Sequence, residues 1–528
     1  MVHKRTYLKL GAFRVVHDQR LKSAQRGDLD TTSSPAGDSA IHSMLYQASA
    51  VIGICFSVHI IPGLQVPPIL QTLRSSESDA CVAYLSIYSL SPHALAYSGE
   101  MASKWSLFVA LLLLALSYAV DLTTITGVRA SSTGSGAAIG NKTVGLPITK
   151  RFNLTGSVGK ILQHNQARAR ALHARGMALV TGTAPPPAAN IPIENQLATY
   201  VATVDIGVPP TSYDLIVDCG SANTWVGSGI PYVQTSTSRR SQNSVAIEYG
   251  NGAIMIGTEF FDTVALGSGM TVLGQSIGVA SKTFDFEGFD GVLGLGPNDL
   301  TLGTLSPDST STILTVVDNL FFQAAIDAHV ISISFEPPLE GSALNGELTF
   351  GGTDPTKFIG AINFAEITTT PPSSEYYGVN QIVRYGQSET LFFESPAIFD
   401  SGTSLVLFAT DVLQTYVNLV GAVFDEATTL YRITPAQYAS LQSLFFIIGD
   451  IQFEFTQNAQ IWPRALNTVI GGSDDFVYLI VNDLGRASGS GMDIVCGMMF
   501  LERFYATFDI DNNRVGIANT QFTTSTIN

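Results

Sequence analysis

Two segments of this 528-residue chain place an aspartate in the same local context. Each is a short apolar run followed by an aspartate, a small residue, a glycine and a hydroxyl residue. The first loop holds Asp218, Cys219, Gly220 and Ser221, and the second holds Asp400, Ser401, Gly402 and Thr403. The glycine permits a tight turn beside the aspartate, and the hydroxyl can hydrogen-bond the carboxylate. One such loop is an ordinary turn, but the matched pair predicts two lobes related by a pseudo-two-fold axis, with both aspartates at that axis.

A pair of adjacent carboxylates can hydrolyse an amide bond. Two close carboxylates cannot both ionise cheaply, so one keeps a proton while the other remains a base. Such a pair titrates as a unit, and it can take a proton from a water while it gives one to a carbonyl oxygen. Asp218 and Asp400 therefore predict hydrolysis of peptide bonds without a metal or any other cofactor.

The residues around these loops predict the strands that must position them. From about residue 195, short β-rich runs are cut by Gly, Pro, Asn and Ser, as at 199–207. This spacing predicts an all-β body, which is long enough to form two lobes. Residues 245–257 indicate a hairpin with Gly250, Asn251 and Gly252 at its tip. A glycine-rich hairpin can close over a bound chain, although a purely structural hairpin shows the same pattern.

The charged residues divide the chain into a basic segment and an acidic body. Residues 122–189 contain 8 Lys or Arg and no acid, whereas residues 190–528 contain 10 Lys or Arg and 35 Asp or Glu. The formal net charge of −16 argues against a general nucleic-acid binder. An acidic body with few cations suits a protein that stays folded in acid, although it also serves solubility.

The N-terminal part of the chain suggests processing. Residues 101–119 combine a lysine, an apolar run of about ten residues and small residues, which is the pattern of a signal peptide. We therefore expect Met101 to be the true start and residues 1–100, which stay unassigned, to be a gene-model extension; an internal signal-anchor is the alternative. Residues 160–176 predict a basic helix that ends at Gly176 and carries Lys160, His164 and Arg168 on one face. Because a secretory signal precedes it, this helix is expected to bind the acidic body rather than nucleic acid.

In combination, these motifs resemble those of the pepsin-like aspartic endopeptidases, especially the fungal, secreted, polyporopepsin-like type. The resemblance covers residues 190–528 and includes the segments 289–296 and 493–518. It implies an all-β, bilobal acid protease fold, with an N-terminal lobe at 190–357, a C-terminal lobe at 358–528 and the active site between them. It also implies a basic propeptide at 120–189 that covers the acidic site at neutral pH and is removed by self-processing in acid.

The resemblance implies a role for each site residue. Asp218 and Asp400 would be the catalytic dyad, supported by the side chains or backbone N–H groups of Gly220, Ser221, Gly402, Thr403, Cys219 and Ser401. The flap would be the hairpin that carries Tyr249, Gly250 and Asn251, with the Tyr249 hydroxyl reaching the indole of Trp225. The implied partners are peptide or protein substrates, the chain's own propeptide and pepstatin-type inhibitors, and the protein is expected to be a monomer. The implied location is extracellular, with the vacuole as the alternative.

The chain departs from the family's pattern at Cys219, where the family has Thr or Ser. That hydroxyl ties the two aspartate loops together, and a thiol is a weaker donor and acceptor. We interpret Cys219 as a tolerated substitution; the alternatives are a weakened protease, a redox-sensitive protease, or an inactive homologue that binds peptides or inhibitors. A disulfide between Cys219 and Cys496 is not expected, because the resemblance places them in different lobes.

Overall fold

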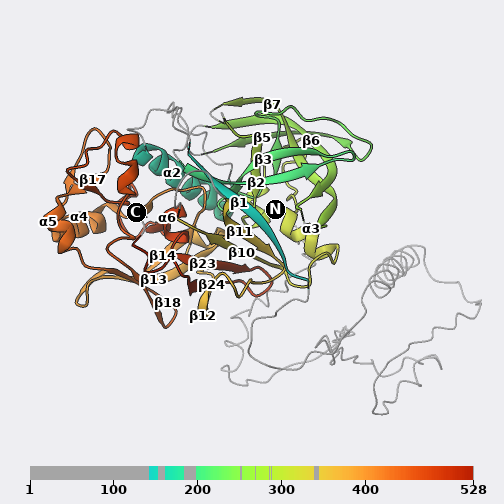
Figure 1. Ribbon diagram of the computed structural model, residues 1–528. Helices are drawn as coiled ribbons and strands as arrows, with labels where there is room; N and C mark the ends of the chain where they lie inside the picture. Colours follow the sequence, from blue (N-terminus) through green and yellow to red (C-terminus); the bar gives the residue numbers. More distant parts are fainter. Residues whose placement is uncertain are drawn as a thin grey trace, which may run out of the picture. The chain divides into compact units, whose positions relative to one another are not determined.

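The structure, a computed structural model, describes the part of the chain that begins at residue 142. The described ranges are 142–152, 161–183, 198–249, 253–267, 269–284, 286, 288–337 and 344–526. All of them belong to the unit that spans Ser131–Asn528. The predictions for residues 1–119, the signal peptide among them, lie outside the described residues. Within the described ranges, strands dominate and helices are few, so the predicted all-β class is confirmed (Figure 1).

The largest sheet of the described residues has 14 strands. In order across the sheet they are β12 (Ile359–Glu366), β24 (Arg514–Asn519), β23 (Phe504–Asp509), β10 (Val330–Phe335), β11 (Leu344–Phe350), β1 (Val144–Phe152), β2 (Ala198–Ile206), β3 (Thr211–Asp218), β8 (Gly291–Gly294), β4 (Trp225–Val226), β7 (Thr271–Phe284), β6 (Ile254–Ala265), β5 (Arg239–Glu248) and β9 (Leu305–Ser306). The sheet therefore joins the N-terminal half of the body to strands near the C terminus.

Two smaller sheets lie in the C-terminal half. The seven-stranded sheet consists of β19 (Ile451–Phe455), β18 (Leu444–Ile448), β13 (Gly378–Tyr385), β14 (Glu389–Phe399), β22 (Ile494–Cys496), β15 (Val406–Phe408) and β21 (Val481–Asp483). The three-stranded sheet consists of β16 (Val423–Phe424), β17 (Tyr431–Ile433) and β20 (Val477–Tyr478).

Within the described ranges, the helices are short, with one exception. They are α2 (Ile161–Thr181), α3 (Val316–Phe322), α4 (Thr410–Val420), α5 (Pro435–Ala439) and α6 (Met498–Leu501), together with the 3₁₀ turns η5 (Asn298–Thr301), η6 (Ser373–Glu375), η7 (Arg464–Leu466) and η8 (Thr468–Ile470). The long helix α2 comes from the segment predicted as propeptide and contacts η5, η6 and β21 of the body (Figure 1). No helix among the described ranges is both long and apolar enough to cross a membrane.

The two halves repeat one strand arrangement around their aspartate loops. In the first half, β3 pairs in parallel with β8, β8 pairs antiparallel with β4, and β4 pairs in parallel with β7. In the second half, β14, β22, β15 and β21 follow the same order with the same directions. Asp218 ends β3 and Asp400 follows β14 directly, so each aspartate is presented at the same point of a repeated unit. This repetition is the pseudo-symmetry that the duplicated sequence motif predicts.

Glycine makes this close strand packing possible. A Cβ on Gly291 would lie 1.9 Å from the carbonyl oxygen of Trp225, and one on Gly497 would lie 2.1 Å from that of Leu405. Real Cβ atoms cannot approach a backbone oxygen so closely, so no other residue fits at either position without moving a strand. The segment that contains Gly291 pairs directly behind Asp218, through the contact of Asp218 with Gly294 in the β3–β8 ladder.

Strand β1, from the segment predicted as propeptide, lies in the middle of the large sheet. It pairs antiparallel with β11 on one side and with β2 on the other. Its Lys150 is 1% exposed, and its ammonium group contacts the carboxylate of Glu502, which also accepts a hydrogen bond of 3.2 Å from the hydroxyl of Tyr200. A buried charge needs such a partner, because leaving either ion alone would cost several kcal/mol.

A second buried ionic group links α3 to the turn between β23 and β24. His329 is 6% exposed, and its two ring nitrogens lie 2.9 Å from Asp318 and 3.0 Å from Asp511. Burial acts to lower the pKa of His329, but the hydrogen bonds and charges of the two aspartates outweigh it and raise the pKa. His329 therefore joins the α3 region to the C-terminal strands, and the two carboxylates favour the protonated form of its imidazole.

Candidate active site

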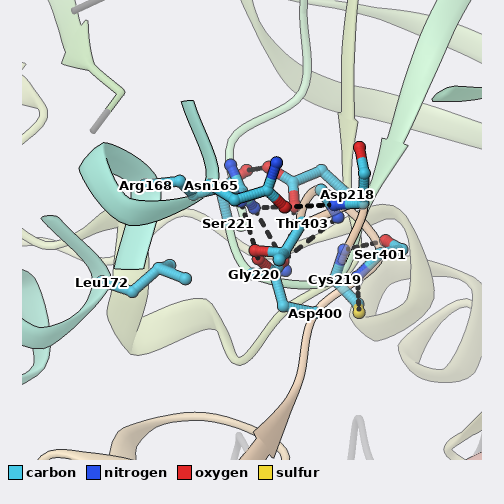
Figure 2. A network of polar contacts seen from close by, with 12 residues as sticks. Asn165, Arg168, Leu172, Asp218, Cys219, Gly220, Ser221, Asp400, Ser401 and Thr403 are labelled. Atoms are coloured by element: carbon cyan, nitrogen blue, oxygen red, sulfur yellow. Dashed lines mark hydrogen bonds and ion pairs between the residues drawn. The ribbon is translucent and has the colours of Figure 1, made fainter. Parts of the chain in front are cut away.

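The two aspartate loops meet in the interior of the protein. Asp218 is 2% exposed and Asp400 is fully buried. The hydroxyl of Ser221 donates a hydrogen bond of 2.6 Å to Oδ2 of Asp218, and the hydroxyl of Thr403 donates one of 2.5 Å to Oδ2 of Asp400. The backbone N–H of the glycine in each loop donates to the Oδ1 atom of its aspartate, over 3.0 Å in the first loop and 3.2 Å in the second. Each carboxylate thus has a fixed orientation, with Oδ2 held by a hydroxyl and Oδ1 by the backbone (Figure 2).

A set of reciprocal contacts ties the two loops together beneath the carboxylates. The backbone N–H of Cys219 donates to the hydroxyl of Ser401 over 2.9 Å, and that hydroxyl donates to the carbonyl oxygen of Val217 over 3.0 Å. In the opposite direction, the backbone N–H of Ser401 lies 3.1 Å from Sγ of Cys219, and this thiol lies 3.4 Å from the carbonyl oxygen of Phe399. The thiol therefore occupies the same position in its half as the hydroxyl of Ser401 does in the other half (Figure 2).

The thiol of Cys219 is shielded from solvent. Burial, followed by the charge of Asp400, raises its pKa to about 12, so the thiolate is not populated near neutral pH. Cys219 and Cys496 are both buried and free, as expected from their places in different halves. A buried, protonated thiol packs as a small apolar group, and its weak hydrogen bonds complete the link between the loops.

The predicted flap begins as a hairpin over this region. Strands β5 and β6 pair antiparallel up to Glu248 and Ile254, and the N–H of Tyr249 then bonds the carbonyl oxygen of Ala253 over 2.8 Å. The indole N–H of Trp225 donates a hydrogen bond of 2.7 Å to the hydroxyl of Tyr249. Both residues belong to a buried cluster that also includes Phe286, whose ring meets the indole edge-on at 4.7 Å. The tip residues Gly250 and Asn251 lie outside the described residues.

Helix α2 places an arginine directly on the two carboxylates. Nε of Arg168 donates to Oδ2 of Asp400 over 2.7 Å, and Nη2 donates to Oδ1 of both Asp400 and Asp218, over 2.7 and 2.5 Å. The side chain of Arg168 is only 9% exposed. The planar guanidinium thus bridges both aspartates with three charge-assisted hydrogen bonds (Figure 2), which is the geometry that arginine favours with carboxylates.

The electrostatics of this group follow from burial and charge. Burial acts to raise the pKa of Asp400, but the charge and hydrogen bonds of Arg168 lower it below its usual range, with help from Thr403 and Gly402. Burial likewise acts to lower the pKa of Arg168, but the charges of Asp218 and Asp400 raise it. With Arg168 in place, Asp400 is therefore an ionised carboxylate rather than the protonated partner that an acid–base pair requires.

Sequence reasoning missed several contacts of α2. Oδ1 of Asn165 accepts the backbone N–H groups of Ser404 and of the residue after it, over 2.8 and 3.0 Å. The sequence predicts only that Arg168 belongs to a basic helix, and its spacing from the aspartates gives no signal that it reaches them. The predicted end of the helix at Gly176 was wrong, because α2 continues to Thr181. Gly176 instead permits close packing, since a Cβ there would lie 2.6 Å from Cβ of Pro372.

Comparisons with known proteins identify the family of this chain. Residues 199–520 match the family model described as eukaryotic aspartyl protease. Polyporopepsin of Irpex lacteus is 52% identical over 341 residues, which is 65% of this chain and 100% of the relative, and cathepsin E of Cavia porcellus is 32% identical over 352 residues, 62% and 83% of the two chains. The crystal structure of the aspartic proteinase from Irpex lacteus matches with a TM-score of 0.62 and 46% identity, over 73% of this chain and 100% of that one. The chain therefore belongs to the pepsin-like family of aspartyl proteases and is an aspartic endopeptidase with the family's bilobal all-β fold.

Proposed function

We propose that this chain is the zymogen of a secreted, acid-acting endopeptidase, with Asp218 and Asp400 as its catalytic dyad and residues 120–189 as its inhibitory propeptide. The observation that carries this proposal is the placement of Arg168 on both carboxylates, at 2.5 Å from Asp218 and 2.7 Å from Asp400. A buried cation on a helix that precedes the body blocks the two groups that the reaction requires.

Once α2 leaves, the two carboxylates can act as an acid–base pair. Without the guanidinium, two adjacent buried carboxylates cannot both stay ionised, so one takes up a proton. The ionised member removes a proton from a water held between them, and the protonated member donates to the carbonyl oxygen of the peptide bond. Ser221 and Thr403 hold the Oδ2 atoms in place, so the carboxylates enter the reaction already oriented.

The docked helix prevents this reaction in two ways. Nη2 of Arg168 occupies the Oδ1 atoms of both aspartates, which excludes the water between them. The helix also uses groups of the body that a peptide would need, since Asn165 takes backbone N–H groups at Ser404 and the Tyr376 hydroxyl donates to the carbonyl oxygen of Leu172 over 2.6 Å. The proposed propeptide therefore competes with a substrate for the same groups.

Acid weakens the docking of α2 by protonating both a carboxylate, Asp400, and an imidazole, His173. Asp400 has a lowered pKa while Arg168 is docked, so its contribution to docking is present at neutral pH and lost as the pH falls through that pKa. The pKa of His173 in α2 is lowered by burial and then by the charge of Arg486. Protonation of His173 therefore also disfavours the docked helix, starting as the pH falls below the ordinary value of 6.5.

The proposal is tested with the chain expressed from Met101. We would incubate it between about pH 3 and about pH 7 with a denatured protein, with and without pepstatin, beside an Asp218→Asn variant. The expected result is self-shortening and pepstatin-blocked cleavage in acid for the parent chain and neither for the variant. Secretion is checked separately by finding the shortened protein in the culture medium rather than in vacuoles.

The second candidate function is a peptide- or inhibitor-binding homologue that does not cut. Its basis is Cys219, which replaces a hydroxyl in the link between the loops. The thiol retains contacts with Ser401 and Phe399, at 3.1 and 3.4 Å, which supports the enzyme instead. A folded protein that binds pepstatin but cleaves no substrate at any pH would favour this second function, and a Cys219→Thr variant would then show whether the thiol is responsible.

A further inference from the structure

The face of α2 that lies against the body carries a row of contacts that extends beyond the aspartates. Asn165, Arg168, Leu172 and Arg175 follow at intervals of three or four residues, so they lie on one face of the helix. Asn165 binds the backbone N–H at Ser404, and Arg168 binds both aspartates. The backbone carbonyl oxygen of Leu172 accepts a hydrogen bond from the buried hydroxyl of Tyr376. Figure 2 shows the side chains of Asn165 and Arg168 at the two aspartates, with Leu172 farther along the helix. Arg175 continues the row on the side away from Ser404.

Arg175 ends this row on a pair of backbone carbonyl groups. Its Nη2 donates a hydrogen bond of 2.9 Å to the carbonyl oxygen of Leu300, and the same nitrogen also contacts the carbonyl oxygen of Leu302. Both oxygens belong to the turn at the end of η5, which is part of the body and not of the proposed propeptide. Burial lowers the pKa of Arg175, yet the guanidinium is held there by two carbonyl dipoles.

We propose that the carbonyl oxygens of Leu300 and Leu302 form a subsite for a cationic side chain of the substrate, which Arg175 fills while the helix is docked. This inference rests on the proposed function, in which α2 occupies the place of a substrate. Two converging carbonyl oxygens accept hydrogen bonds and donate none, so they suit an ammonium or guanidinium group and disfavour a carboxylate. The subsite therefore selects Lys or Arg and rejects Asp or Glu.

The helix also gives the position of this subsite along the substrate. Arg175 is seven residues beyond Arg168, which corresponds to about 10 Å along an α-helix. An extended peptide advances about 3.3 Å per residue, so the same span corresponds to about three residues from the bond that is cut. The preferred cation is therefore expected at the third residue from that bond, on the side of the aspartates opposite Ser404. The Tyr376 hydroxyl lies between the two points and can hold the peptide backbone as it holds Leu172.

The overall charge of the body favours the same substrates. Residues 190–528 contain 10 Lys or Arg against 35 Asp or Glu. An excess of negative charge attracts cationic peptides over a distance, and the two carbonyl oxygens then give that attraction a defined position.

The test uses the enzyme obtained by self-processing of the chain and a series of fluorogenic octapeptides. Each peptide keeps the same apolar residues at the cleaved bond and carries lysine, norleucine or glutamate at one of the second, third or fourth positions on either side. Norleucine has the length of lysine without its charge. We expect kcat/KM to be about tenfold higher for lysine than for norleucine at the third position on one side only, mainly through a lower KM, with glutamate below norleucine.

Each outcome bears on a different claim. Equal kcat/KM for lysine and norleucine at every position, in peptides that are cleaved, would overturn the subsite and leave the proposed function intact. Failure of the chain to shorten itself in acid, together with failure to cleave any of the peptides, would overturn the proposed function itself. In the uncut chain, Arg175→Lys should keep the pH of self-processing near that of the parent, while Arg175→Gln should move it upward; the exposed Arg170 provides the matched control as Arg170→Gln. A preference for lysine that appears equally at all positions would also contradict the inference, because it would reflect overall charge alone.

Discussion

The replacement of Arg168 by alanine is the sharpest test of whether α2 inhibits the active site. The guanidinium makes three hydrogen bonds of 2.5 to 2.7 Å with two carboxylates, one of them with a side chain that is 0% exposed. Removing one partner of a buried ion pair costs about 3–5 kcal/mol, because it leaves a buried charge without compensation. In Arg168→Ala one of the two carboxyl groups can take up a proton, so we expect the lower end of that range, a loss of about 3 kcal/mol in the free energy of helix docking. At 1.4 kcal/mol per factor of ten, the population of the released helix should rise about 100-fold.

The assay measures hydrolysis of a fluorogenic peptide by the uncut chain at about pH 6, in the first minutes before any self-shortening is visible on a gel. The initial rate should rise about 100-fold in Arg168→Ala, and amide hydrogen exchange in residues 161–181 should accelerate by a similar factor. The initial rate of Arg168→Lys should fall between those of the parent chain and Arg168→Ala, since an ammonium group cannot bridge both carboxylates as the planar guanidinium does. The matched control is Arg170→Ala, which removes the same charge from an exposed position of the same helix. Equal rates for the Arg168→Ala and Arg170→Ala chains would refute the reasoning.

Three further predictions follow from buried groups. Replacing His173 by glutamine should move the pH midpoint of self-processing to a lower value, because the pKa of His173 is lowered in the docked helix and its protonation below the ordinary 6.5 favours release of α2. A series of gels over pH measures this midpoint. An unchanged midpoint would mean that protonation of carboxylates alone releases the helix. The pKa of His329 is raised in the folded protein, so its contribution to stability is complete below the ordinary value of 6.5 and is lost as the pH rises through the folded pKa. The variant His329→Gln should therefore have a lower Tm at about pH 5, and its Tm should fall less steeply above neutral pH than that of the parent. An equal loss of Tm at acid and at neutral pH would contradict this. The thiol of Cys219, with a pKa of about 12 and no exposure, should resist iodoacetamide in the folded protein and react after unfolding, and Cys219→Thr should change kcat/KM less than about tenfold; rapid alkylation of the native protein would show that the thiol is accessible.

Much of the candidate site was predictable because its parts are local in sequence. The loops at Asp218 and Asp400 carry their own hydroxyl and glycine partners within three residues, so the hydrogen bonds to each carboxylate follow from the motif. The hairpin before Tyr249 is also local, and alternation with a glycine-rich tip was enough to place it.

Other features could not be read from local patterns. The hydrogen bond between Arg168 and Asp400 joins residues 232 positions apart, and nothing in the composition of a basic helix specifies which arginine reaches the dyad. The predicted end of α2 at Gly176 is wrong because glycine, although common just after a helix, here lies inside α2 and allows contact with Pro372. The insertion of β1 into the large sheet depends on strand edges contributed by β2 and β11, which are distant in the chain.

The sequence by itself determined the family, the all-β class and the two carboxylates, since each depends on short motifs and on the alternation of apolar residues. The tertiary structure decided the state in which these carboxylates are held. Arg168 bridges both of them because α2 packs against η5 of one half and against η6 and β21 of the other. Cys219 completes the link to Ser401 because the two aspartate loops meet. Ion pairs and close contacts of this kind depend on the positions of distant segments in space, and a linear sequence does not contain that information in any local window.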